Sequence, residues 1–237
     1  MAQIIYMVTT VVVSTLSTLA TFWTMYNFAM FCWNPWRSSQ VTDEIFWSLF
    51  VDLLLLAMFV LQHSVMKAPF LRSLLEKLRL HVLERPLYVL SSSLTLLLLM
   101  GWWHHTPHYV AWQVDEGRWL GSARAAFHVY AWVVIYFGCF IFDIADLLGV
   151  KQVYYDLCGM NEPAHYRSKG LCRFLCHYRH PSFSAFCLVF WLQSLMSLDR
   201  LLLAVYMTGY MAFRWNLDQE DYNYHKSMLN KKEQEIS

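Results

Sequence analysis

Six runs of apolar residues, separated by shorter polar segments, set the pattern of this chain. They cover residues 4–32, 46–66, 86–104, 125–148, 182–198 and 199–217, and a polar tail follows at 218–237. A helix needs about 20 apolar residues to cross a bilayer, and the last two runs reach that length only with their polar flanks or in locally thin membrane. The pattern predicts an all-α, polytopic membrane helix bundle with six transmembrane helices, forming a single domain over residues 1–237.

Two of the segments carry a further pattern. The first run is rich in Ser and Thr, whose hydroxyls bond back to their own helix or across to a neighbour, so we expect a packed span. Residues 67–85 are too charged to span. Their apolar positions nevertheless recur at helical spacing, which predicts an additional helix lying on the membrane surface. These positions are Leu71, Leu74, Leu75, Leu78 and Val82.

Composition supports a membrane protein. Hydrophobic residues make up 57% of the 237 positions, more than a soluble domain of this length could bury. The formal net charge of +1 gives no reason to expect a nucleic-acid partner, and membrane lipids are the expected surroundings. The six cysteines are scattered rather than arranged as a disulfide framework, so we expect most of them to be reduced.

Basic residues are distributed unevenly between the two sides of the predicted bundle. Six spans place the segments that begin at Lys67, Lys151 and Arg214 on one side, and these carry fourteen of the eighteen Lys and Arg residues. Segments rich in Lys and Arg remain on the cytoplasmic side of a membrane. The distribution therefore predicts that both termini face the cytoplasm or the nucleoplasm.

This orientation gathers ionisable residues at the cytoplasmic leaflet. Asp143 and Asp146 fall in the last two turns of the fourth span, three residues apart and so on one helix face. Charged groups at membrane depth are costly unless they are paired or face a cavity. Either Arg179 pairs with one of these acids, or the set lines a ligand pocket. The set comprises His63, Asp143, Asp146, Arg179, His180, Glu220 and Asp221.

Short motifs at this leaflet resemble known membrane families. Arg179-His180-Pro181 precedes an apolar hairpin and Asp218-Gln219-Glu220-Asp221 follows it, which resembles the isoprenylcysteine carboxyl methyltransferase superfamily from about Gly170 onward. The front half resembles the bacterial NnrU family. The motifs there are Gln62-His63-Ser64-Val65-Met66 and Glu84-Arg85-Pro86-Leu87-Tyr88.

Nearly the whole chain resembles the nurim family of multi-pass proteins of the inner nuclear membrane. The residues that carry this resemblance are Phe142-Asp143, Gly149-Val150-Lys151-Gln152-Val153-Tyr154-Tyr155, Asp199-Arg200-Leu201-Leu202-Leu203-Ala204 and Leu217-Asp218-Gln219. The resemblance implies residence in the nuclear inner membrane or the endoplasmic reticulum.

The methyltransferase resemblance implies a site for S-adenosylmethionine. Arg179 and His180, in the motif that ends at Pro181, would contact the carboxylate of the cofactor, and Glu220 its amino group or ribose, with Asp218 and Asp221 beside it. A cation fork suits a carboxylate, and an acid suits an ammonium. A prenylated tail would enter from the lipid. The expected pocket lining is His63, Asp143, Asp146 and Tyr178.

Three functions stay open at this point. The first is a nurim-like protein with a methyltransferase-like pocket, acting structurally or binding a lipid. The second is an S-adenosylmethionine-dependent methyltransferase acting on a lipid-borne, prenylcysteine-like carboxylate. The third is a haem- or quinone-linked role for His63 and His180. No metal site is predicted, because the Cys and His spacing near Cys176 matches no common zinc pattern and the histidines at 104, 105 and 108 suit a solvated loop.

Overall fold

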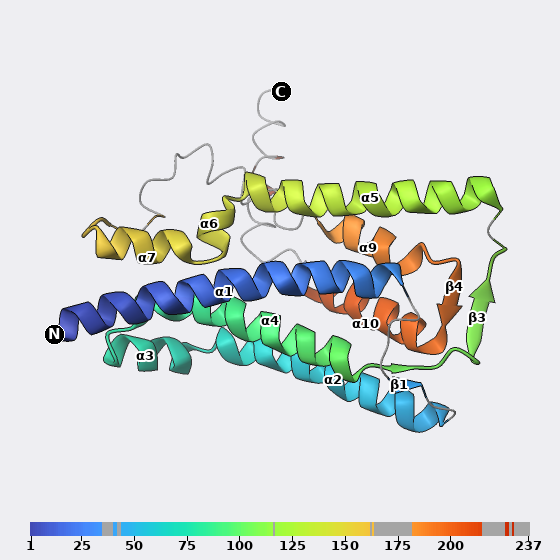
Figure 1. Ribbon diagram of the computed structural model, residues 1–237, viewed down its shortest axis with the longest axis horizontal. Helices are drawn as coiled ribbons and strands as arrows, with labels where there is room; N and C mark the ends of the chain where they lie inside the picture. The colour runs from blue at the N-terminus through green and yellow to red at the C-terminus, as the bar shows by residue number, and fades with distance from the viewer. Residues whose placement is uncertain are drawn as a thin grey trace.

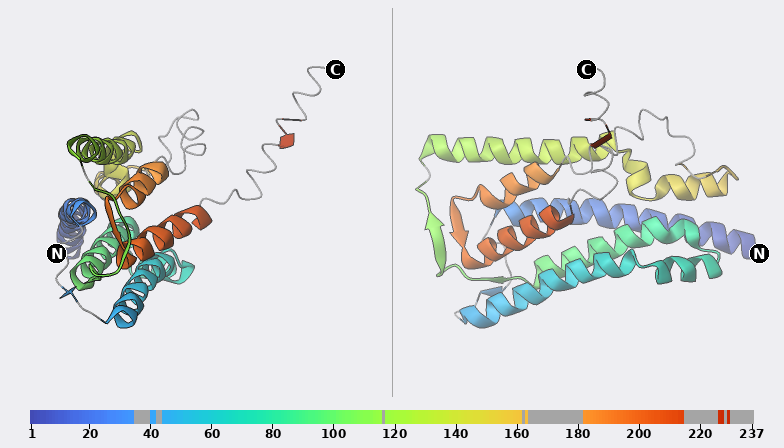
Figure 2. Two further views of the ribbon diagram at one scale, coloured as in Figure 1. Left: turned by 90° about the vertical axis from the view of Figure 1, so that its right-hand side faces the viewer. Right: turned by 180° about the vertical axis from the view of Figure 1, so that it is seen from behind.

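Four long helices lie side by side and form the body of the protein (Figures 1 and 2). They are α1 (Ala2–Trp33), α2 (Ile45–Met66), α4 (Glu84–Trp102) and α5 (Arg118–Ile141). Each coincides with one of the first four apolar runs, because a helix satisfies its own backbone hydrogen bonds and can stand in lipid. These four segments are long and apolar enough to cross a membrane, α4 together with the turn before it.

The computed structural model describes most of the chain. The described residues are 1–34, 40–41, 44–115, 117–161, 163, 182–214, 226–227 and 229. Within them the prediction of an all-α membrane helix bundle is confirmed. The four described cysteines, at positions 32, 139, 158 and 187, are free thiols, as expected.

The last two apolar runs form a shorter pair of helices. These are α9 (Phe183–Trp191) and α10 (Leu198–Arg214); α9 packs against α5 and α10, and α10 packs against α2. At about 1.5 Å per residue, the nine residues of α9 are too short to cross a hydrocarbon core of about 30 Å, and the 17 residues of α10 nearly reach it. The count of six transmembrane helices therefore stays a prediction.

Two small sheets close the end of the bundle at which α4 finishes (Figure 1). Strand β1 (Gln40–Val41) pairs in parallel with β2 (His104–His105). Strand β3 (Val110–Gln113) pairs antiparallel with β4 (Leu195–Ser197), with an irregularity in register after Val110. The segment that the sequence predicts as a loop after residue 104 is thus partly extended and tied to the α9–α10 connection.

The predicted helix between the second and third runs is present but short. It is α3 (Pro69–Lys77), and a single 3₁₀ turn, η1 (His81–Leu83), joins it to α4. Between them Arg79 has a φ of 58°, a left-handed conformation that an α-helix cannot continue through. On α3, Leu75 is buried while Phe70 is exposed, so one face packs on the protein and the other is open to its surroundings.

The fourth run ends earlier than predicted. Helix α5 stops at Ile141, and the chain continues as α6 (Ile144–Leu147) and α7 (Val150–Leu157). Asp143 and Asp146 therefore do not share a face in the last turns of the span. The break occurs because Asp143 has a φ of 63° and accepts a hydrogen bond from the backbone N–H of Asp146 (3.4 Å), which starts a new helix.

A glycine makes the next turn. Gly149 has a φ of 82° and lies against the ring of Pro86, so closely that a Cβ at this position would overlap the proline Cδ. Only glycine combines this conformation with this approach. The contact places α6 and α7 against the start of α4.

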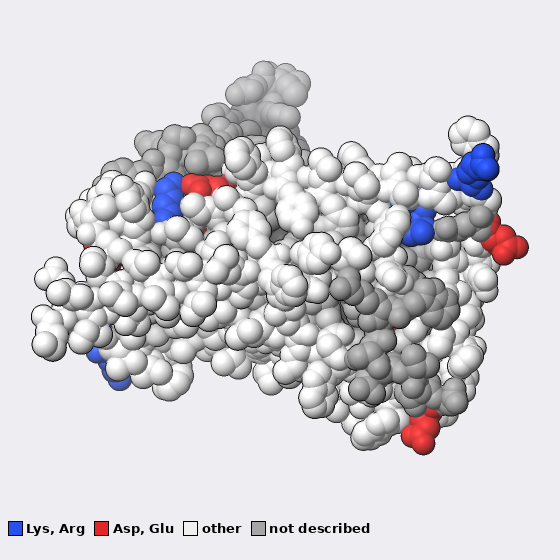
Figure 3. All heavy atoms as spheres, viewed as in Figure 1, with Lys and Arg blue, Asp and Glu red and all other residues white. Residues whose placement is uncertain are grey.

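The Ser- and Thr-rich first span is packed, as predicted. Ser17 donates a hydrogen bond to the carbonyl oxygen of Pro86 (2.9 Å), and the hydroxyls of Thr21 and Ser93 are 3.2 Å apart. These bonds join α1 to α4. Figure 3 shows that Lys, Arg, Asp and Glu side chains on one face lie at the two ends of the bundle, with uncharged residues between them. An uncharged band between charged ends is the surface expected of a protein that crosses a bilayer.

Candidate functional site

A cavity of about 460 Å³ opens at the end of the bundle where α3 lies. Its walls come from the end of α2, α3, η1, the start of α4, and the α6–α7 segment. We call it the Arg85 cavity. The side chains that give it its chemistry are Lys67, Arg72, Arg85, Tyr88, Asp146 and Asp156.

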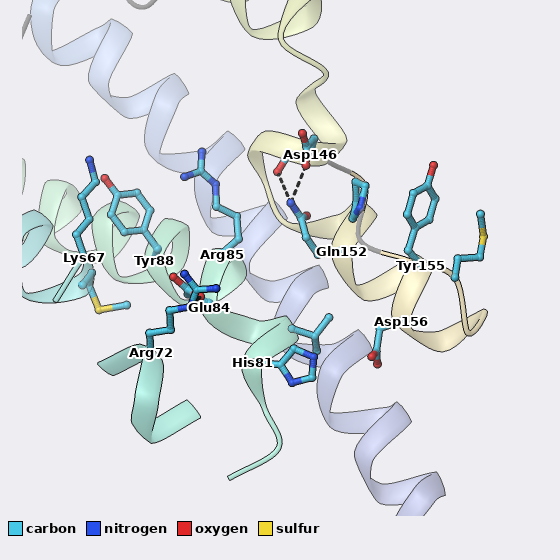
Figure 4. A pocket seen from close by; sticks show the side chains of 14 residues that line it. Lys67, Arg72, His81, Glu84, Arg85, Tyr88, Asp146, Gln152, Tyr155 and Asp156 are labelled. Atoms are coloured by element: carbon cyan, nitrogen blue, oxygen red, sulfur yellow. Dashed lines mark hydrogen bonds and ion pairs between the residues drawn. The ribbon is translucent and has the colours of Figure 1, made fainter. Parts of the chain in front are cut away.

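The basic wall is organised around Tyr88 on α4 (Figure 4). The Arg85 guanidinium carbon lies 5.4 Å from the centroid of the Tyr88 ring, and the Lys67 Nζ lies 6.0 Å from it. Both distances suit a cation–π contact. Arg85 Nε also donates to the carbonyl oxygen of Leu147 (2.8 Å), which fixes the guanidinium beside the α6–α7 segment.

The acidic wall belongs to α6 and α7. Asp146 Oδ1 accepts a hydrogen bond from the side-chain amide of Gln152 (2.6 Å), and Asp156 Oδ2 accepts one from the hydroxyl of Tyr6 on α1 (2.8 Å). Both donors are neutral, so these two bonds orient the carboxylates and leave their negative charges in place. A break after α5 was needed to bring these two acids to the cavity.

An exposed ion pair borders the opening. Arg72 Nε lies 3.3 Å from Glu76 Oε1 and 3.8 Å from Glu84 Oε2. The Arg72 side chain is 67% exposed, so these pairs are screened by solvent and stabilise the fold little.

Asp146 lines the cavity among the residues that the sequence predicts for the site, and two others lie nearby. The His63 ring packs on Phe59 and Tyr88, with centroids 4.4 and 5.5 Å away, and so lies behind the wall. Asp143 binds Lys151 instead (2.6 Å), and this hydrogen bond holds the pKa of Asp143 below its usual range. Tyr178, Arg179, His180, Pro181, Asp218, Glu220 and Asp221 lie outside the described residues.

Sequence reasoning missed Lys67, Arg85, Tyr88 and Gln152 as lining residues. One signal could have found two of them. The motif Glu84-Arg85-Pro86-Leu87-Tyr88 supports the resemblance to the NnrU family, and the structure places its Arg85 and Tyr88 together in the cavity.

A second polar cluster, at the opposite end of the bundle, was not predicted. We call it the Asp199 cluster: Asp52, Trp103, His105, Thr106, Asp199 and Arg200. Asp199 is fully buried and accepts hydrogen bonds from the Trp103 indole (3.0 Å) and the Thr106 hydroxyl (3.0 Å). His105 Nδ1 lies 3.1 Å from the same carboxylate.

The rest of the cluster is equally enclosed. The Arg200 guanidinium lies 4.0 Å from the centroid of the Phe31 ring, with its Nε 3.7 Å from Asp199 Oδ2. Asp52 on α2 is fully buried and accepts a hydrogen bond from the backbone N–H of His104 (2.8 Å).

Two expectations about this end were wrong. His105 is 1% exposed rather than solvated, and Asp199 and Arg200 start α10 inside the protein rather than forming a surface turn. Their partners are about a hundred residues away in the chain, so local polarity predicts exposure where tertiary contacts produce burial. His108 is exposed, as expected, and the described ranges contain no group of three residues able to hold a metal ion.

The two ends are suited to different roles. The Asp199 cluster is buried and hydrogen-bonded, so its chemistry is that of a structural lock between α2, α4 and α10. The Arg85 cavity is hollow and carries charged groups of both signs. It is the candidate functional site.

Long apolar helices, an uncharged middle surface and charged ends define a multi-pass α-helical membrane protein. Comparison with known proteins identifies the family. The chain is 41% identical over 187 residues to the "Nurim homolog" of Drosophila pseudoobscura pseudoobscura, covering 78% of this chain and 74% of that protein. It is 35% identical over 206 residues to "Nurim" of Rattus norvegicus, covering 85% and 78%. This chain belongs to the nurim family.

The "Nurim" of Xenopus laevis is 38% identical over 190 residues, covering 77% of this chain and 65% of that protein. No family model matches the chain. No solved structure matches it.

Proposed function

We propose that this protein resides in the inner nuclear membrane and endoplasmic reticulum, and that its Arg85 cavity holds the polar headgroup of a membrane lipid. Its role is structural rather than catalytic, and both termini face the nucleoplasm or cytoplasm. The location is inferred from the family. The observation that carries lipid binding is the cavity itself, a hollow of about 460 Å³ with polar walls at one end of an apolar bundle.

The helices beside the cavity support this depth in the membrane. Helix α3 exposes Phe70 (74%) and Leu78, and α7 exposes Tyr154 (59%) and Val150. Short helices with an exposed apolar face lie in the interface between lipid headgroups and acyl chains. A cavity between two such helices opens where headgroups are.

Native mass spectrometry of the purified full chain tests lipid binding. We expect the wild type to retain a phospholipid and Met66→Trp to lose it, because Met66 lines the cavity and an indole would fill it. Val65→Trp is the matched control, since Val65 is 54% exposed on the same helix and is not part of the lining. Equal retention by both variants would place the lipid elsewhere.

Glycosylation mapping tests the orientation. An acceptor site inserted near His108 is expected to be modified, and one near Asn161 is expected to remain unmodified. The reverse pattern would invert the proposed topology.

The second candidate is an S-adenosylmethionine-dependent methyltransferase acting on a lipid-borne carboxylate. One observation favours it: the cavity has a cationic wall for a carboxylate and an acidic wall for an ammonium, and the cofactor carries both. Calorimetry with S-adenosylhomocysteine should then show saturable binding that His180→Ala and Glu220→Ala abolish and His108→Ala preserves. Absence of heat from folded protein would remove this candidate.

A further inference from the structure

We propose that the Arg85 cavity selects lipids whose headgroup carries both a phosphate and a primary ammonium, as ethanolamine and serine phospholipids do. This inference rests on the proposed function above and names the chemical class of the lipid.

Opposite charges face each other across the cavity (Figure 4). Lys67 and Arg85 lie beside Tyr88, whereas Asp146 and Asp156 project from α6 and α7. Arg72 and Glu84 add one charge of each sign at the opening. The formal charges therefore balance, and a ligand with a single charge would match one wall and oppose the other. A zwitterionic headgroup matches both.

The basic wall suits a phosphate. Arg85 uses its Nε to bind the carbonyl oxygen of Leu147, so the side chain is held in place while its terminal nitrogens extend beyond that bond. A fixed guanidinium fork can donate two parallel hydrogen bonds to phosphate oxygens, and Lys67 adds a second positive charge. A phosphate here would also lie over the polar edge of the membrane, where phospholipid phosphates are found.

The acidic wall suits an N–H donor. Asp146 and Asp156 each accept one hydrogen bond from a neutral group in this structure, and a carboxylate has about four acceptor positions. The amide nitrogen of Gln152 donates to two oxygens of Asp146, at 2.6 and 3.3 Å, which fixes the amide orientation. Gln152 Oε1 is then a buried acceptor without a hydrogen-bond partner among the described residues.

The chemistry of this wall separates headgroups that differ little in size. A primary ammonium has three N–H donors for Gln152 Oε1 and the two carboxylates. The trimethylated nitrogen of choline has none, and glycerol carries no positive charge. Burying an acceptor without a donor is unfavourable, so the cavity should favour ethanolamine over choline although both headgroups carry the same phosphate.

The test is a lipid competition on the full chain in nanodiscs that contain equal amounts of phosphatidylethanolamine, phosphatidylcholine and phosphatidylglycerol. Bound lipid is identified by native mass spectrometry. We expect an ethanolamine-to-choline ratio of about ten in the wild type, the factor expected when one hydrogen bond to a charged group is lost. A ratio near one would overturn the inference.

Three variants assign the preference to the two walls. Asp156→Asn keeps an acceptor for Tyr6 but removes the charge, and should lower the ethanolamine-to-choline ratio. Arg85→Gln should reduce the binding of all three lipids and leave the ratio unchanged. Lys77→Gln, an exposed change outside the lining, should match the wild type. An unaltered ratio in folded Asp156→Asn would contradict the role of the acidic wall.

The outcomes separate this inference from the proposed function. Wild type that retains no phospholipid overturns both. Retention of phospholipid without preference for ethanolamine overturns only the headgroup chemistry. Soluble glycerophosphoethanolamine should displace the lipid weakly; if it displaces lipid as well as an equal concentration of phosphatidylethanolamine does, the ligand is a free metabolite and the lipid assignment is wrong.

Discussion

The two ends of this bundle use the same kinds of side chain for opposite purposes. At one end, Asp199 is fully buried and surrounded by donors from Trp103, Thr106 and Arg200. At the other, Asp146 and Arg85 line a hollow of about 460 Å³. Charged groups inside a membrane protein thus become a lock when the protein supplies every partner, and a binding site when it leaves room for a ligand.

The backbone accounts for the difference. At the Asp199 end, the pairing of β3 with β4 ties the loop after α4 to the start of α10 and closes the space. At the Arg85 end, the fourth long helix stops at Ile141, and the turns at Asp143 and Gly149 redirect the chain into two short helices. These helices cover one side of the cavity and leave it open.

Removing the centre of the lock should have the largest effect. Asp199→Ala leaves Arg200 buried beside the unpaired donors of Trp103 and Thr106, so we expect a loss of about 3–5 kcal/mol in the free energy of unfolding. Chemical denaturation in detergent micelles measures it. Asp115→Ala, an exposed acid in the loop at the same end, should change stability by less than about 0.5 kcal/mol. Similar losses in both variants would show that the cluster is not a lock.

The turn that shapes the cavity should come next. Gly149→Ala places a methyl group against Pro86 and forces a side chain into a φ of 82°, so we expect destabilisation of about 2–4 kcal/mol. Gly159→Ala is the control: its φ is 66°, and a Cβ there meets nothing within 4 Å. It should cost only the backbone strain, about 1–2 kcal/mol. Thermal unfolding of the two variants separates packing from strain.

The smallest effect concerns pH. The bond from Lys151 lowers the pKa of Asp143, and Asp143 raises that of Lys151. The stabilisation is therefore present between the two unfolded-state values, about 4 and 10, and is lost as pH falls through the lowered pKa of Asp143 or rises through the raised pKa of Lys151.

Both side chains are partly exposed, 44% for Asp143 and 32% for Lys151, so the pair should contribute at most about 0.5 kcal/mol. Asp143→Asn should remove this part of the pH dependence of unfolding, measured from pH 3 to 7. An unchanged profile would show that the pair contributes nothing in solution.

The helices of this protein could be predicted because their cause is local. An apolar run of about 20 residues needs no distant partner to form a helix in lipid, and the first four runs correspond to α1, α2, α4 and α5. The end of α5 could not be placed, since it depends on the conformation of Asp143 and on the approach of Gly149 to Pro86, more than sixty residues earlier in the chain.

The candidate site divides in the same way. Asp146 was predicted near a pocket from topology alone, but its neighbours Arg85, Gln152 and Asp156 were not, because each reaches the cavity through a turn that local pattern does not show. His105 and Asp199 were expected at the surface and are buried.

The sequence by itself determined that the chain is a multi-pass helical membrane protein of the nurim family, because hydrophobic length and family motifs are properties of the chain. Tertiary structure alone decided which charges are sealed and which are left facing a cavity. The physical reason is that the cost of a buried charge depends on the groups around it, and those groups arrive from distant parts of the chain.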